Sequence, residues 1–150
     1  MSNNSKVHSL VIDFLGALGV PYTVSYTSER AGNMPFKTLF GLSKLLQEYG
    51  IESEGYLLRD KEEIVKLTPP FIAETEEGFT IVTGLENDKV SYLTQGVEEV
   101  VPLSDFMQVW DGNVMLSFPA PDAKEPFYER HSRIEMLMKA KKWVLFTSVT

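Results

Sequence analysis

Cysteine is absent from this chain of 150 residues, and histidine occurs only twice. Without a thiol there can be no disulfide, no cysteine nucleophile and no cysteine-ligated zinc or iron–sulfur centre. Two histidines are also too few for a histidine-rich metal site. The sequence therefore predicts neither a bound metal nor a cofactor, and the lack of cysteine fits a reducing compartment.

Basic side chains are scarce as well, and the N-terminus lacks a long apolar run. The chain contains 14 lysines and arginines and 21 aspartates and glutamates, so its net charge is −7. Such a chain lacks the positive charge that binds phosphates, so we expect no nucleic-acid partner. The first ten residues contain no apolar region of the kind found in signal peptides. The 43% of hydrophobic residues is typical of a globular domain.

No group of residues predicts a catalytic site by itself. His8 and Asp13 are five positions apart and so lie on different faces of a helix. His131 stands among charged side chains and is predicted to lie on a solvated surface. Phosphate-binding glycine loops and the Gly-x-Ser-x-Gly motif do not occur. Three pairs of adjacent acids lie near turns or exposed edges and are expected to be solvated too: Glu62–Glu63, Glu76–Glu77 and Glu98–Glu99.

The hydrophobic spacing changes near Pro70, from a helical period to alternation. Helices are predicted at 6–19 and 38–49, with a short one at 60–67. Residues 22–26 are expected to form a short strand and residues 28–35 a loop. Further strands are expected at 55–58, 71–75, 78–85, 89–93, 97–101 and 113–118, with a short helix at 104–110. Helices followed by antiparallel strands make an α+β pattern.

A break at Pro119, Pro121 and Pro126 divides the chain into a domain at 1–119 and a C-terminal segment at 120–150. Residues 121–150 carry six basic and four acidic side chains, whereas the first 120 residues carry eight and seventeen. A helix is predicted at 128–142. Three lysines precede Trp143 and the short apolar run after it, an order that is typical of the cytoplasmic end of a membrane helix. This run is much shorter than the roughly 20 apolar residues that are needed to span a bilayer. The alternative is an edge strand or a last helical turn in the domain's own core.

Several blocks between Lys6 and Phe118 resemble peptidase family C thirty-nine. These papain-like cysteine peptidases trim double-glycine leaders at the N-terminus of bacterial peptide-exporting transporters. The similarity rests on the order and spacing of Pro70–Ala73, Phe79–Val82 and Trp110–Leu116. It implies a papain-like cysteine peptidase fold, with N-terminal helices packed on an antiparallel sheet.

The catalytic triad of this family does not occur at the matching positions. The family cysteine begins the first helix, near Lys6 and Val7, while Gly78 and Thr94 stand where the family has its histidine and aspartate. The resemblance therefore implies an inactive domain and no enzyme activity. Its former substrate groove, lined by these four residues, would bind a peptide or a protein partner.

A closer resemblance involves Tyr22–Thr23, Phe40–Lys44 and Tyr49–Glu52. These runs are similar to the N-terminal domain of Bacteroidetes membrane proteins that continue into a vitamin K epoxide reductase-like region. This likeness implies a cytoplasmic domain tethered to the inner membrane. Two alternatives remain open: a structural appendage of such a membrane enzyme, or a domain that acts in leader-peptide processing and export.

Overall fold

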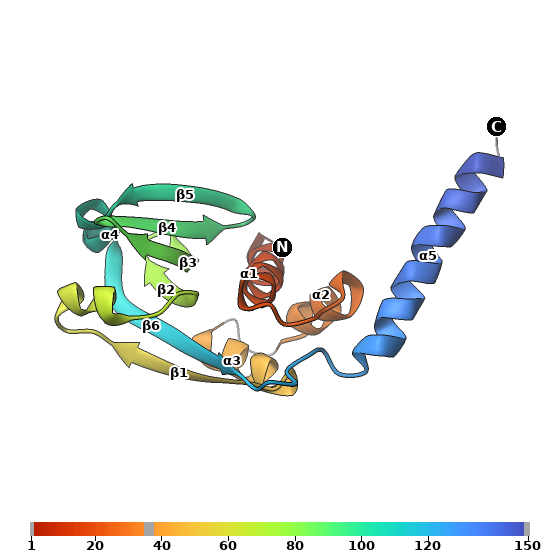
Figure 1. The fold of residues 1–150 in the computed structure, drawn as a ribbon, viewed down its shortest axis with the longest axis horizontal. Helices are drawn as coiled ribbons and strands as arrows, with labels where there is room; N and C mark the ends of the chain where they lie inside the picture. Colours follow the sequence, from red (N-terminus) through yellow and green to blue (C-terminus); the bar gives the residue numbers. More distant parts are fainter. Residues whose placement is uncertain (1, 35–37, 149–150) are drawn as a thin grey trace.

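Three helices precede a six-stranded antiparallel sheet (Figure 1). The computed structural model describes residues 2–34 and 38–148, with side chains for 10–34 and 38–141. The helices are α1 (Ser2–Leu18), α2 (Val24–Gly32), α3 (Leu39–Glu48), the 3₁₀ helix η1 (Lys61–Lys66), α4 (Leu103–Val109) and α5 (Tyr128–Ser148). The strands are β1 (Ile51–Leu57), β2 (Phe71–Thr75), β3 (Gly78–Glu86), β4 (Lys89–Thr94), β5 (Val97–Pro102) and β6 (Trp110–Pro119). The predicted α+β class is confirmed.

The sheet has the order β1-β6-β2-β3-β4-β5, and apolar side chains are buried on both of its faces. On β2, Ile72 faces the core shared with α1, α2 and α3, whereas Phe71 and Ala73 face a second core. This second core also contains Phe106 and Trp110, at α4 and the start of β6. Successive residues of a strand point to opposite faces, so a strand covered on both sides is apolar throughout.

The first helix is held by one continuous apolar stripe. Val11, Phe14 and Leu15 are fully buried, and Leu18 packs beside them. This spacing of three and four residues places all of them on one face of a helix. Figure 1 shows α1 grouped with α2 and α3 at one side of the sheet, while α4 lies at the opposite end. The predicted helix-on-sheet arrangement is therefore correct.

The strand predicted at 22–26 and the loop predicted at 28–35 are wrong, because α2 occupies 24–32. The buried residues of α2 are Thr27 and Ala31, and Thr23 at its N-cap is also buried. These three residues have a helical spacing of four, but two of them are polar. The apolar period that identifies a surface helix is therefore missing. Residue 35, the last of the predicted loop, lies outside the described residues.

Glu125, in the segment between β6 and α5, is a fully buried carboxylate. One oxygen, Oε1, accepts hydrogen bonds from the Thr23 backbone N–H at 2.7 Å and from the Thr27 hydroxyl at 3.0 Å. The Thr23 hydroxyl lies 2.9 and 2.8 Å from the two oxygens. His131 Nδ1 lies 2.8 Å from Oε2. A buried charge is tolerated only when it is paired or hydrogen-bonded, and Glu125 meets this condition with groups from α2 and α5.

His131 does not lie on a solvated surface, so that prediction is wrong. Its side chain is 22% exposed, and its ring stacks on Tyr26 with the centroids 4.4 Å apart. The error arises because charged neighbours in the sequence indicate that the helix is exposed as a whole but not which of its faces is covered. His131 lies on the face toward α2, where it contacts the buried Glu125, six residues earlier in the chain.

The same network continues into α3. The Thr27 and Tyr49 hydroxyls are 2.6 Å apart, and burial raises the pKa of Tyr49. The backbone N–H of Lys124 donates to the carbonyl of Tyr49, and that of Glu125 donates to the carbonyl of Pro21. The segment after β6 is thereby joined to the ends of α2 and α3 before α5 begins.

Beyond its first turns α5 projects away from the rest of the chain (Figure 1). It extends to Ser148, six residues past the predicted end, so the residues around Trp143 have helical backbone. The side chains of Trp143 and Phe146, on which the membrane and core interpretations depend, lie outside those described. Among the described residues, no helix combines the length and apolar character needed to cross a bilayer.

Replacing Glu125 with alanine should lower the free energy of unfolding by about 3 kcal/mol, because three buried donors on Thr23 and Thr27 would lose their acceptor. Urea denaturation followed by circular dichroism measures this change. Glu129→Ala is the control, since that glutamate is exposed and pairs only with Lys124 and its own helix. Equal losses in the two variants would contradict the structural role of Glu125.

Candidate functional site

Two of the four predicted site residues lie together at one end of the sheet. Gly78 begins β3 and Thr94 ends β4, and these strands are neighbours. The pairing of Ile81 with Leu93 continues to Thr80 and Thr94, whose hydroxyl oxygens are 2.6 Å apart. Thr94 therefore lies opposite Thr80, which is two positions after Gly78.

The first helix lies beside the same pair of strands. It packs against β3 and β4, and Asp13 on α1 accepts a hydrogen bond from the Gly96 N–H at 2.9 Å. Lys6 and Val7 lie on α1 about two turns before Asp13. Their side chains lie outside those described, so the placement of all four residues around one groove stays a prediction.

A hollow of about 360 Å³ runs between α1 and this part of the sheet. Asp13, Gly16 and Tyr22 line it on the helical side, and Leu93 and Glu98 line it on the sheet side. Neither Gly78 nor Thr94 is among the residues that line it. Gly78 has no side chain, and the hydroxyl of Thr94 is bonded to Thr80. Neither residue can serve as an acid or a base near neutral pH, so these two positions can contact a ligand but cannot transfer its protons.

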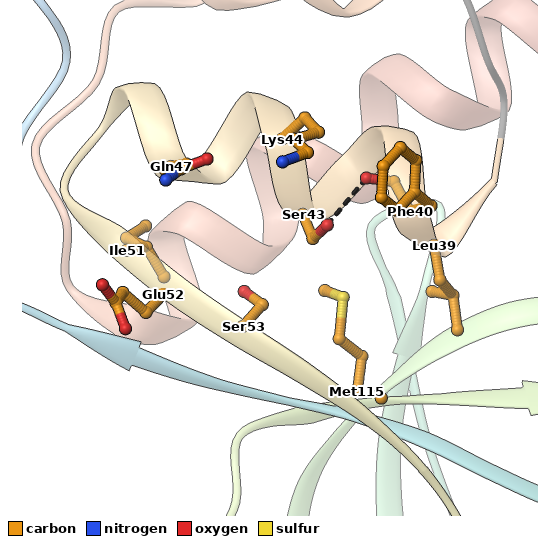
Figure 2. Close-up of a pocket in the computed structure, with 10 residues that line it drawn as sticks. Leu39, Phe40, Ser43, Lys44, Gln47, Ile51, Glu52, Ser53 and Met115 are labelled. Carbon is orange, nitrogen blue, oxygen red and sulfur yellow. Dashed lines mark hydrogen bonds between the residues drawn. The ribbon is translucent and has the colours of Figure 1, made fainter.

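A second groove, of about 560 Å³, lies between α3 and β1 (Figure 2). Phe40 and Lys44 border it on α3, Ser53 and Gly55 on β1, and Met115 contributes from β6. Phe40 is 64% exposed, and the Lys44 ammonium lies 5.3 Å from the centre of its ring. Figure 2 shows the Phe40 and Lys44 side chains on the side of α3 above β1. Nothing in the sequence distinguishes this groove, because Phe40 simply extends an apolar run.

The acidic side chains differ in their surroundings. The three sequence-adjacent pairs are exposed, as predicted. Glu74 on β2 and Asp111 on β6 instead come together from positions far apart in the sequence. Burial, the charge of Asp111 and a hydrogen bond with Asp111 raise the pKa of Glu74, while the Asn113 amide acts in the opposite direction. Within the described residues no group of three histidines, aspartates or glutamates is arranged to hold a metal ion.

Replacing Glu74 with glutamine should raise the free energy of unfolding near neutral pH. A carboxyl whose pKa is higher in the folded than in the unfolded protein destabilises the fold when ionised. This penalty disappears below the unfolded pKa of about 4.3, because both states are then protonated. The stability difference between the variant and the wild type should therefore shrink as the pH is lowered, in urea titrations at several pH values. The exposed Glu76 serves as the control, and Glu76→Gln should show no comparable gain.

Comparison of the sequence with family models finds no match, and no curated protein matches it. The structure, in contrast, is similar to solved peptidase domains. A double-glycine motif protease from an AMS/PCAT transporter, in complex with its leader peptide, has a TM-score of 0.65 and 15% identity. The match covers 77% of this chain and 86% of that one.

Two further structures have the same fold. The peptidase domain of Streptococcus ComA, a bifunctional ABC transporter involved in quorum sensing, has a TM-score of 0.62 and 17% identity, over 77% of this chain and 92% of that chain. The N-terminal peptidase C39-like domain of a toxin secretion ATP-binding protein from Vibrio parahaemolyticus has a TM-score of 0.60 and 16% identity. That match covers 77% of this chain and 97% of the other. The chain thus has the α+β fold of peptidase C39-like domains.

Proposed function

We propose that this chain is an inactive peptidase-like domain that binds a peptide. The observation that supports this most directly is a fold shared with a protease solved with its leader peptide, in a chain that contains no cysteine. A cysteine peptidase requires a thiolate nucleophile and a neighbouring base. Gly78 and Thr94, at the positions where the resemblance places the base and its orienting acid, can supply neither.

The proposed binding groove lies between α1 and the end of β3 and β4. Lys6, Val7, Gly78 and Thr94 are its proposed lining residues. The hollow beside α1 supports a groove between this helix and β4, because it offers an apolar surface at Leu93 and polar groups at Asp13 and Glu98. Loss of catalytic groups leaves shape and hydrogen-bonding backbone in place, which is sufficient for binding without cleavage.

A synthetic double-glycine leader peptide should bind the purified chain and remain uncut. Calorimetric titration measures the affinity, and mass spectrometry after prolonged incubation measures cleavage. Ala17→Arg should weaken binding by about tenfold, because Ala17 is an exposed residue of α1 that lines the hollow, and a long charged side chain there would enter it. Thr68→Arg adds the same side chain at an exposed position after η1 and should leave the affinity unchanged.

Cleavage of the peptide would contradict the proposed inactivity. Absence of binding, or equal weakening by the two arginine variants, would contradict the proposed groove. Absence of binding would favour the structural appendage, for which no ligand is required.

We also propose that residues 1–119 form the binding domain and residues 120–150 a connection to a membrane region, on the cytoplasmic side of the inner membrane. Support comes from the excess of basic residues after position 120 and from exposed apolar side chains on α5, among them Met136 and Leu137. Lysines before an apolar segment are retained on the cytoplasmic side. The resemblance to the N-terminal domain of vitamin K epoxide reductase-like proteins also supports a connection to a membrane region. Recovery of the full gene product in the soluble fraction after cell lysis would contradict this connection.

A further inference from the structure

Strand β1 forms one edge of the sheet and leaves part of its backbone unpaired. Among the described strands it pairs only with β6. Ala120 N–H donates to Gly50 O, and Leu58 N–H donates to Gly112 O, while the register between these two bonds is regular. In an antiparallel pair the hydrogen-bonded positions alternate, so the even-numbered residues of β1 direct their backbone groups toward β6. The odd-numbered residues, including Ser53 and Gly55, direct theirs outward.

The groove of Figure 2 runs along this free edge. Ile51, Ser53 and Gly55 share one face of β1, and all three line the groove together with Phe40 and Met115. Gly55 has no side chain, and a Cβ placed there would have no neighbour closer than 3.9 Å. The edge therefore offers outward N–H and C=O groups and, beside them, space for an apolar side chain.

The opposite face of β1 is acidic. Glu52 and Glu54 alternate with Ser53 and Gly55 and are exposed, and Glu52 also lines part of the groove. Glu54 accepts a hydrogen bond from the Tyr56 hydroxyl, and no ion pair of the described residues includes either carboxylate. Basic side chains directly across from them on an added strand would be favourable, since opposite charges form stabilising cross-strand pairs.

A second copy of this strand is a poor occupant of the edge. Two β1 strands paired antiparallel about their centre would place Glu54 opposite Glu54, or Glu52 opposite Glu54. Like charges directly across from one another destabilise a sheet, and acidic edges are a common protection against such self-association. The charge of the edge thus favours a basic strand from another protein or peptide.

The other edge of the sheet lacks these features. Strand β5 ends at Pro102 and carries Glu98 and Glu99, of which Glu99 is bonded to Tyr92. Among the described residues of β5, only Glu98 lines the hollow beside α1.

We infer that the outer edge of β1 is a second peptide-binding site, which adds an extended segment with alternating basic and apolar residues as a further strand. Its apolar side chains would enter the groove between α3 and β1, and its basic side chains would lie across from Glu52 and Glu54. Backbone hydrogen bonds at a free sheet edge provide affinity, and alternate side-chain pockets provide specificity. This site is separate from the proposed groove at Gly78 and Thr94, because β6 and β2 lie between β1 and β3.

Nuclear magnetic resonance of the ¹⁵N-labelled chain, titrated with a short capped peptide of alternating lysine and valine, tests this inference. We expect chemical-shift changes and slowed amide exchange at Ser53 and Gly55. Raising the salt concentration should weaken binding, because the carboxylates are exposed. A peptide with glutamate in place of each lysine is the matched ligand control and should not bind.

Three variants separate the contributions of space, backbone and charge. Gly55→Val fills the groove and should weaken binding by about tenfold, without strain, since β-branched residues suit a strand. Ser53→Pro removes an outward N–H that β6 does not use and should therefore weaken binding, while proline is tolerated at this place in an edge strand. Ser53→Ala is its control. Both variants lose the hydrogen bond to the Ser117 hydroxyl, but the alanine variant keeps the N–H and should bind normally. Glu52→Lys should weaken binding, whereas Glu86→Lys, at the exposed end of β3, should not.

Binding that is equal in Gly55→Val and the wild type would overturn the inference, as would shift changes centred on β5. Concentration-dependent changes at Ser53 without peptide would show self-association at this edge and would also overturn it. Ala17→Arg should leave this titration unaffected. Failure of the leader-peptide experiment and failure of this one are therefore distinguishable.

Discussion

The buried carboxylate of Glu125 connects parts of the chain that would otherwise be separate. It binds Thr23 and Thr27 on the side of α2 and His131 on α5, and the Thr27 hydroxyl continues to Tyr49 after α3. A buried charge is costly unless all its partners are in place, so this network forms completely or not at all. The position of α2, the path of the chain after β6 and the direction in which α5 leaves the domain all depend on it.

The two grooves differ in what they offer a ligand. The hollow at α1 is bordered by Asp13 and Leu93, while Gly78 and Thr94 on the neighbouring strands can transfer no proton. The groove at α3 combines an apolar floor with a free strand edge. A chain without cysteine can retain both surfaces, because binding needs shape and hydrogen-bonding groups rather than a nucleophile.

Regular apolar spacing made most of the fold predictable. The stripe of α1 and the short apolar runs within β2 and β3 identify their elements, because these residues are buried against apolar partners. Helix α2 was not predictable in this way, since two of its three buried positions are threonines that bind a glutamate about a hundred residues away. For the same reason neither His131 nor the pair Glu74–Asp111 could be recognised, because long-range contacts bring these polar groups together.

The order of the strands has a consequence for how the chain acquires its structure. Strand β1 leaves the ribosome early, but its only partner among the described strands, β6, begins more than fifty residues later. Contacts between distant segments form slowly because a long loop must first be closed. During this interval both sides of β1 are unpaired. Glu52 and Glu54 then act as gatekeepers, since charged side chains within a nascent strand oppose its aggregation with other chains.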